Sequence, residues 1–269
     1  MSGDQETGTS LRLLYAAEGG VRSIFSEKTT DYAASRPDYP AALFEVLKMN
    51  CAPNKDAVVA DIGAGTGNLT QGLLKSGYRV VAVEPNAEMR DVSDFRLGKI
   101  AGYSSINGSA ESIPLESASI DLITAAQAFH WFEVERARTE FLRILTARGQ
   151  VALIWNDRIF EDPLHVALDG VFSKFGGAKR AALVAHEDRS DVPRFFGSTQ
   201  PEQFSWPHEH YLNREGLLSL VFSRSYIPGR NTLAGPVIAD RVSEIFSRFE
   251  NNETVKVQYW TVAIIGRPT

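Results

Sequence analysis

The chain has 269 residues, of which 43% are hydrophobic and 23% are charged, and its formal net charge is −5. This composition is typical of a globular protein, and the absence of any stretch rich in lysine and arginine argues against nucleic acid or an anionic membrane as partner. No apolar run reaches about 18 residues, and the first ten residues lack the features of a signal peptide. We therefore expect a cytoplasmic protein that binds a small molecule. The sequence carries no signal for an oligomeric state.

The predicted elements begin after a polar, glycine-rich start, and residues 11–25 form a weakly amphipathic segment that either covers a pocket or frays. Residues 57–61 predict a buried strand. Residues 68–75 predict a helix with Leu69, Leu73 and Leu74 facing inward and Gly77 as its stop. The same reasoning predicts strands at 78–84, 103–107, 119–126 and 150–155, and helices at 86–93 and 134–145. Strands that are continuously apolar and alternate with helices indicate a doubly wound α/β fold with a mostly parallel sheet.

The pattern is less regular beyond Trp155. Helical stretches follow, and residues 188–201 predict a loop. Residues 202–212 predict an edge strand, because Pro207 suits only an edge. The remaining elements are helices at 213–224 and 236–249 and a last strand at 253–266. Without a repeat or a low-complexity linker, we expect one domain over 1–269, with a cap at 1–50, a binding core at 51–156, and helices and strands at 157–269 that contribute to a pocket.

A glycine-rich loop stands between the first predicted strand and the helix that follows it. The stretch "DIGAGTGNL" at 61–69 spaces its glycines as G-x-G-x-G, whereas dinucleotide sites need G-x-G-x-x-G/A and Asn68 occupies the sixth position. Such glycines permit positive φ and close approach of a ligand, and the helix N-terminus favours an anionic group. Asp61 and Glu84 end the first two strands, and Glu84 suits the two ribose hydroxyls of an adenosine. The alternatives are a tight turn without a ligand and, for Glu84, a solvated strand end.

Five ordered segments carry a resemblance to a known family. They are "YAASRPDYP", "VVADIGAGTGNLTQGLL", "VVAVEPNAEM", "GSAESIPLESASIDLITAAQAFHWF" and "EFLRILTARGQVALIWNDR", and "FSRSYIPG" extends the match weakly. Together they resemble the class I S-adenosylmethionine-dependent methyltransferases, in particular a small-molecule branch that includes trans-aconitate methyltransferases and a related bacterial group. The resemblance implies a seven-stranded sheet with a helical cap, S-adenosylmethionine as cofactor, and S-adenosylhomocysteine as product.

The resemblance also implies a set of cofactor-binding residues. They are Arg36, Asp61, Gly63, Ala64, Gly65, Gly67, Glu84, Pro85, Met89, Ser109, Ala110, Glu111 and Gln127. The family often has an Asp at the position of Ser109 that accepts from the adenine amino group, so here that contact is expected from backbone, water or Glu111. Ala110 would offer its backbone N–H to the adenine ring, and Met89 either lies along the adenosine or belongs to the core.

Two segments supply candidates for the reaction itself. Tyr32, Arg36 and Tyr39 belong to a turn that the family folds over the cofactor, where Arg36 would pair with the methionine carboxylate and Tyr32 would face the methyl group. The alternatives are a structural ion pair for Arg36 and core packing for Tyr32. His130 in "AFHWF" is the candidate general base, although a lone histidine is often structural.

The expected acceptor is an aromatic or heterocyclic metabolite methylated on oxygen or nitrogen. Phe129, Trp131 and Trp155 would bound its pocket, although Trp131, like Phe132, could instead only position the following helix. The alternatives are an aliphatic carboxylate like trans-aconitate, which would need cationic residues in the pocket, and a protein that binds the cofactor without catalysis.

No metal site and no disulfide are expected. His208 and His210 have the same-face spacing of a strand, but no third ligand lies nearby in sequence. Cys51 is the single cysteine, so it has no partner for a disulfide, and we expect a structural role for it.

Overall fold

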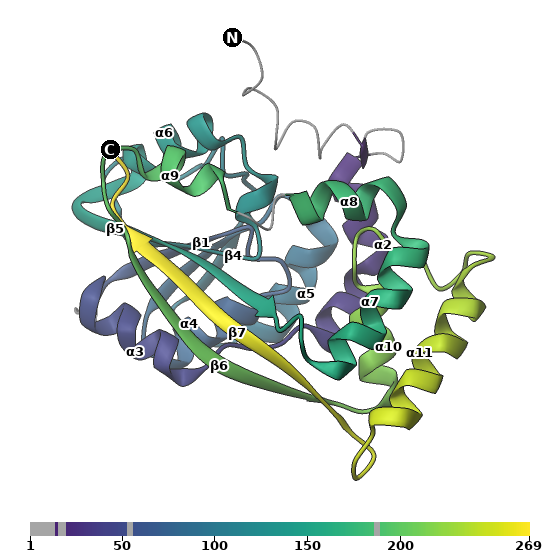
Figure 1. The fold of residues 1–269 in the computed structure, drawn as a ribbon. Coiled ribbons are helices and arrows are strands. Elements are labelled where there is room, and N and C mark those ends of the chain that lie inside the picture. The colour runs from purple at the N-terminus through teal and green to yellow at the C-terminus, as the bar shows by residue number, and fades with distance from the viewer. Residues whose placement is uncertain (1–13, 16–19, 53–55, 186–188) are drawn as a thin grey trace.

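A computed structural model describes residues 14–15, 20–52, 56–185 and 189–269 (Figure 1). In these residues seven strands form one sheet in the order β3-β2-β1-β4-β5-β7-β6. The strands are β1 (Val58–Ile62), β2 (Arg79–Val83), β3 (Tyr103–Ile106), β4 (Ile120–Ala126), β5 (Leu145–Arg158), β6 (Glu202–Leu212) and β7 (Val255–Gly266). β1 pairs in parallel with β2 and β4, whereas β7 runs antiparallel between β5 and β6. The predicted α/β sheet, mostly parallel with seven strands, is confirmed.

Helices cover both faces of this sheet. The helices of the described residues are α2 (Gly20–Ser35), α3 (Ala41–Asn50), α4 (Asn68–Lys75), α5 (Ala87–Leu97), η1 (Phe129–Trp131, a 3-10 turn), α6 (Val134–Ile144), α7 (Pro163–Phe175), α8 (Gly177–Ala185), α9 (Asp191–Phe196), α10 (Arg214–Phe222) and α11 (Gly235–Phe249). One core layer contains the buried leucines of α3 and α4, and the opposite layer contains apolar residues of α6 and α9. Residues 41–50, which were predicted to belong to the cap, therefore form a helix of the sheet's cover.

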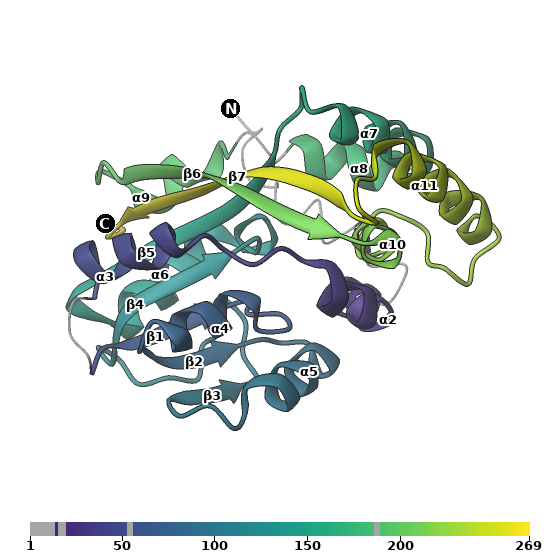
Figure 2. The ribbon, with the colours of Figure 1, turned by 90° about the horizontal axis from the view of Figure 1, so that it is seen from below.

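A second group of helices, α2, α7, α8, α10 and α11, lies beyond the carboxyl ends of the parallel strands (Figure 2). α7, α10 and α11 share a third apolar cluster with the adjoining ends of β6 and β7. α2 lies along α10, and its buried Lys28 donates to the carbonyl oxygens of Phe222 at 2.8 Å and Ile227 at 2.7 Å. A cation is favourable here because the last carbonyls of a helix lack intrahelical donors. This contact holds the N-terminal helix over the end of the sheet where open α/β proteins bind ligands.

Several element boundaries differ from the sequence-based predictions. Tyr32 lies inside α2, which continues to Ser35, and only residues 36–40 are non-helical, so the predicted turn over 32–39 is wrong. Residues 191–196, predicted as loop, form α9. Its Val192, Phe195 and Phe196 are buried against the sheet, and this tertiary burial stabilises a helix with weak local signals. β5 is longer at both ends than the predicted 150–155 because it pairs with β4 and β7 over most of its length.

The edge strand and the single cysteine agree with their predictions. β6 covers residues 202–212 at the sheet edge and includes Pro207. Cys51 is buried and free, and burial raises the pKa of its thiol to about 12. Across the part of the chain that the structure describes, no helix combines the length and apolarity that crossing a bilayer demands.

Candidate functional site

The glycine loop connects β1 to α4, and all three of its glycines have positive φ. A Cβ on Gly63 would lie 2.7 Å from Cβ of Ala128, and one on Gly67 would lie 2.6 Å from Oγ of Ser93. Protein atoms therefore exclude a side chain at these two positions. Gly65 differs, because its added Cβ would meet nothing closer than the Tyr32 ring at 3.6 Å. A Cβ at Gly65 would therefore be in ordinary van der Waals contact with Tyr32 and Met89, so this position is less crowded than Gly63 and Gly67.

The Glu84 carboxylate ties this loop to the end of β2. It is buried, and it accepts hydrogen bonds from the backbone N–H groups of Gly65 and Asn86, each at 2.9 Å. Burial raises the pKa of Glu84, and the two N–H donors oppose that shift. Asn86 in turn caps α5 by accepting from the Met89 N–H at 2.8 Å. The loop, the acid and the start of α5 therefore form one hydrogen-bonded unit.

Asp61 lies deeper, at the junction of three elements. Its carboxylate accepts from Oγ1 of Thr70 on α4 at 2.6 Å and from Oγ1 of Thr124 on β4 at 2.8 Å. Only 1% of the residue is exposed, and burial raises its pKa to about 6 despite these hydrogen bonds. Asp61 therefore links β1, α4 and β4, and it also lines a cavity.

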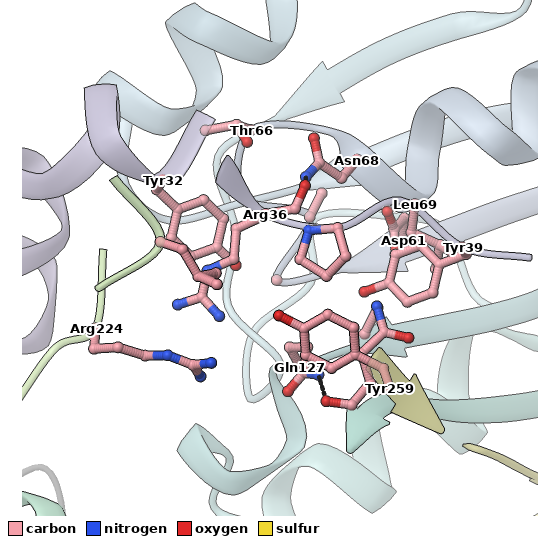
Figure 3. Close-up of a pocket in the computed structure, with 16 residues that line it drawn as sticks. Tyr32, Arg36, Tyr39, Asp61, Thr66, Asn68, Leu69, Gln127, Arg224 and Tyr259 are labelled. Atoms are coloured by element: carbon pink, nitrogen blue, oxygen red, sulfur yellow. Dashed lines mark hydrogen bonds between the residues drawn. The ribbon is translucent and has the colours of Figure 1, made fainter. Parts of the chain in front are cut away.

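That cavity is narrow, about 40 Å³, and lies between the glycine loop and the end of α2 (Figure 3). Its lining includes the predicted residues Tyr32, Arg36, Asp61, Gly63, Ala64 and Gln127. Four buried side-chain atoms of the lining have no hydrogen-bond partner in the described residues: Arg36 Nε, Thr66 Oγ1, Arg224 Nε and Tyr259 OH. Because buried polar atoms are rarely left unsatisfied in native proteins, this cluster of N–H and O–H donors fits an anionic group of a ligand.

Arg36 extends from the end of α2 into this cavity. Its guanidinium lies 4.4 Å from the centre of the Tyr32 ring, and Nη2 approaches the Ser223 carbonyl oxygen at 3.5 Å. Burial lowers its pKa, and the positive charge of Arg224 adds to the shift while Tyr32 opposes it. Within the described segments no carboxylate forms an ion pair with Arg36, so the structure provides no support for the alternative of a structural ion pair.

A second and larger cavity of about 530 Å³ adjoins the first. The two share five lining residues: Tyr32, Arg36, Gln127, Asn156 and Arg224. Of the fourteen other residues that line the large cavity, six have side chains with aromatic rings: His130, Trp131, Trp155, Phe160, Tyr226 and Trp260. Its volume lies within the usual range for small-molecule sites, about 300–1,000 Å³.

The residues that follow β4 lie in different environments, some in the lining of a cavity and one in the core. Gln127 has a φ of 54°, and its Nε2 donates to the Asn156 carbonyl oxygen at 3.2 Å. His130 and Trp131 of η1 line the large cavity. The prediction that Phe129 bounds the same pocket is wrong, because Phe129 is 5% exposed and packs edge-to-face with Trp155 and Phe195 in the core. One 3-10 turn thus directs neighbouring rings to opposite sides.

The remaining predicted cofactor residues follow the carboxyl ends of β2 and β3, which pair with each other. They are Pro85, Met89, Ser109, Ala110 and Glu111, and they lie outside the linings of the two cavities. Met89 and Ala110 are buried, and Ser109 forms a bridge with Ser112. Glu111 accepts from the backbone N–H of Glu133 at 2.8 Å, so its carboxylate is directed toward the start of α6.

Sequence reasoning missed Arg224, Thr66 and Tyr259. Arg224 belongs to "FSRSYIPG", residues 222–229, which carried only a weak family signal. Tyr259 lies in β7, where its ring reads as a core residue by alternation. What identifies these residues is that they line the same cavity. That cavity forms through contacts between distant segments, so local sequence patterns do not reveal it.

The two histidines of β6 have structural contacts. His208 Nε2 lies 3.0 Å from Oδ1 of Asp38, and His210 Nε2 lies 3.1 Å from the Ser35 carbonyl oxygen. They hold the segment that follows α2 against the sheet. Among described residues, no group of three or more His, Cys, Asp or Glu side chains has the arrangement of a metal site.

The known proteins that this chain resembles in sequence are methyltransferases. A family model described as a methyltransferase domain matches residues 60–153. An uncharacterized methyltransferase of Mycobacterium tuberculosis is 32% identical over 243 residues, which are 89% of this chain and 93% of the relative. An uncharacterized methyltransferase of Schizosaccharomyces pombe is 30% identical over 247 residues, 90% of this chain and 96% of the relative.

Solved structures agree in fold. A protein from Anaeromyxobacter dehalogenans described as a type II methyltransferase has a TM-score of 0.67 at 21% identity, covering 87% of this chain and 99% of that chain. A methyltransferase from an antibiotic biosynthesis pathway of Anabaena variabilis has a TM-score of 0.53 at 19% identity, with coverage of 86% and 98%.

Proposed function

Since this chain belongs to the class I S-adenosylmethionine-dependent methyltransferases, we propose that it methylates an oxygen or nitrogen of a small aromatic or heterocyclic molecule. The observation that carries the proposal is the pair of adjoining cavities. One borders the glycine loop, the other is large and aromatic, and five residues line both. An acceptor in the large cavity would meet the methyl group at this shared boundary.

The residues around the loop fit S-adenosylmethionine, which when bound supplies an electrophilic methyl group on its sulfonium. Glu84 accepts from backbone donors at each carboxylate oxygen and still has lone pairs for ribose hydroxyls. Gly65 lacks the Cβ that would contact Tyr32 and Met89, so a ligand can approach its backbone closely. We assign Met89 to the adenosine side and the backbone N–H of Ala110 to the adenine ring.

Arg36 would bind the methionine carboxylate. Its Nε is buried and has no hydrogen-bond partner among the residues that the structure describes, and the guanidinium faces the narrow cavity (Figure 3). A guanidinium binds a planar carboxylate through two parallel hydrogen bonds. Thr66, whose buried hydroxyl also lacks a partner in the described residues, lies in the same lining and offers a further donor.

Catalysis would rest mainly on positioning. Methyl transfer from a sulfonium is an in-line displacement, so holding the acceptor atom on the axis of the breaking bond supplies much of the rate. Tyr32 and Gln127 line both cavities, and we assign them to the boundary that the methyl group crosses. His130 lines the large cavity, and we assign it to removing a proton from an acceptor hydroxyl or nitrogen.

A panel of acceptors with labelled S-adenosylmethionine tests this proposal. We expect label in phenols, aromatic amines or nitrogen heterocycles, and none with enzyme carrying a disrupted glycine loop. Turnover of aliphatic polycarboxylates such as trans-aconitate without turnover of aromatic acceptors would replace the proposed substrate class by the alternative. If no acceptor in the producing cell's metabolite extract takes label while S-adenosylhomocysteine still binds, the chain is a non-catalytic cofactor-binding protein.

A further inference from the structure

The charges in the lining of the large cavity are unbalanced. It contains Arg36, Arg158, Arg189 and Arg224, and Asp157 is its carboxylate residue. Desolvating a guanidinium that faces a confined space costs free energy, unless a counter-charge or a ligand compensates its charge. Each arginine is therefore informative about what the cavity accepts.

Two of the four have anionic partners in the protein. Arg189 donates to both carboxylate oxygens of Asp157, and its guanidinium lies 4.4 Å from the centre of the Trp155 ring. Arg158 lies 3.6 Å from the carboxylate of Asp169 on α7. Asp169 also accepts from Nη2 of Arg180 at 2.6 Å, so Arg158 shares its partner. Both arginines nevertheless have a carboxylate partner without a ligand.

Arg36 and Arg224 lack a carboxylate partner in the residues that the structure describes. The guanidinium of Arg224 forms no hydrogen bond there, and its Nε is buried. Its guanidinium lies 5.8 Å from the centre of the Phe172 ring. One guanidinium can bind a carboxylate through two parallel hydrogen bonds, which is the role proposed for Arg36. Arg224 is then available for a second anion.

We propose that Arg224 binds a carboxylate of the methyl acceptor, so that the acceptor is an acidic molecule with an aromatic or heterocyclic body. This inference rests on the proposed function and names the substrate class of the same site. It joins the two chemistries of the large cavity, because aromatic side chains contact the body of the acceptor while Arg224 binds its anionic group.

The position of Arg224 suits this role. It directly follows the C-cap of α10 in a tight turn, in which its N–H donates to the Val221 carbonyl oxygen at 3.2 Å and its carbonyl accepts from Ile227 N–H at 3.1 Å. Its side chain reaches the boundary between the cavities (Figure 3). The buried hydroxyl of Tyr259 shares the narrow lining and lacks a partner in the described chain, so it offers a neutral donor beside the guanidinium.

Binding of a matched acid and amide tests the proposal without requiring turnover. Calorimetry would measure benzoate and benzamide against protein saturated with S-adenosylhomocysteine, which keeps the probes out of the methionine carboxylate site. We expect benzoate to bind more tightly than benzamide. Arg224→Gln should weaken benzoate about tenfold or more, the scale of a lost charge-assisted hydrogen bond, and leave benzamide and S-adenosylhomocysteine unchanged.

Two further variants test whether the effect on benzoate binding belongs to the guanidinium of Arg224. Arg241→Gln removes the same charge from an exposed position of α11 outside both cavities, and it should leave benzoate binding intact. Arg224→Lys keeps the charge without the planar fork and should bind benzoate with intermediate affinity. Thermal unfolding checks that each variant is folded.

Failure of this inference is distinguishable from failure of the proposed function. Equal affinity for benzoate and benzamide, absence of benzoate binding, or equal losses in Arg224→Gln and Arg241→Gln would overturn the assignment of Arg224. Methyl transfer to neutral aromatic acceptors alone would overturn it too, while supporting the proposed function. Loss of S-adenosylhomocysteine affinity in Arg224→Gln but not in Arg36→Gln would assign Arg224 to the cofactor and overturn the inference.

Discussion

The glycine loop and the cavities beside it are built in different ways. The loop and its acid come from residues 61–89, which are contiguous in sequence, and their hydrogen bonds run largely through backbone N–H groups. The narrow cavity adds lining residues from α2, β5, β7 and the turn after α10, and the large cavity is lined by side chains from α2, η1, β5, β6, β7 and the same turn. Backbone geometry in one short segment therefore defines the loop, whereas the linings of both cavities exist only after distant segments have packed.

The largest expected effect tests the backbone-built side. Gly65→Val should abolish binding of S-adenosylhomocysteine, because the side chain would fill the space between the loop, Tyr32 and Met89, and the φ of +58° is strained for a β-branched residue. Calorimetry on protein shown to be folded measures this. Gly77→Val is the matched control, since its φ is +93° and no atom lies within 4 Å of its added Cβ. Retained affinity in Gly65→Val would contradict the role of the loop.

The next effect concerns the side-chain-built side. His130→Ala should lower kcat by about a hundredfold or more, the usual contribution of a general base, without changing affinity for S-adenosylhomocysteine. The measurement is turnover at saturating acceptor, once the panel has identified one. Phe160→Ala serves as a control, because this exposed cavity residue carries no titratable group and its loss should raise KM instead. Unchanged kcat in His130→Ala would end the proposal of a base.

Glu84→Ala tests the cofactor side of the site by itself. It should weaken S-adenosylhomocysteine binding by about 1.5–3 kcal/mol, the range for hydrogen bonds to charged groups, because the ribose loses its acceptor. The variant also leaves Gly65 N–H and Asn86 N–H without their carboxylate. Calorimetry beside Glu116→Ala, an exposed acid outside both cavities, provides the comparison. Equal affinity in the two variants would refute the ribose role.

The smallest expected effect concerns stability. Burial raises the pKa of Asp61 from 3.8 to about 6 in the folded state, so between these pH values the folded protein keeps a proton that the unfolded chain has lost. The stabilisation by this proton is complete below about pH 4 and is lost as the pH rises through 6. Asp61→Asn removes this dependence. The free energy of unfolding of the wild type relative to the variant should fall by on the order of 2 kcal/mol across that window.

Denaturant unfolding at a series of pH values measures this difference. Parallel profiles for the two proteins would show that Asp61 titrates alike in the folded and unfolded states. The cofactor affinity of Asp61→Asn, measured in the same series, would report separately on its predicted place in the binding site.

Much of the sheet could be predicted from local patterns. The bounds of α4, the three inward leucines of that helix and the edge strand at 202–212 agree with the prediction, because apolar spacing and the restrictions on proline act over a few residues. The helix at 191–196 could not be predicted in this way, since its phenylalanines gain their burial from the sheet. The course of α2 through Tyr32 likewise depends on α10, to which Lys28 connects it.

The sequence by itself determined the fold class, the methyl donor and the loop around Gly65, because each depends on residues close together along the chain. Only the tertiary structure decided that Trp131 faces the large cavity while Phe129 belongs to the core. It also brought Arg224 beside Arg36, although they are 188 positions apart in the chain. The physical reason is that a cavity is the space left between packed elements, so its lining and its charge follow from long-range contacts.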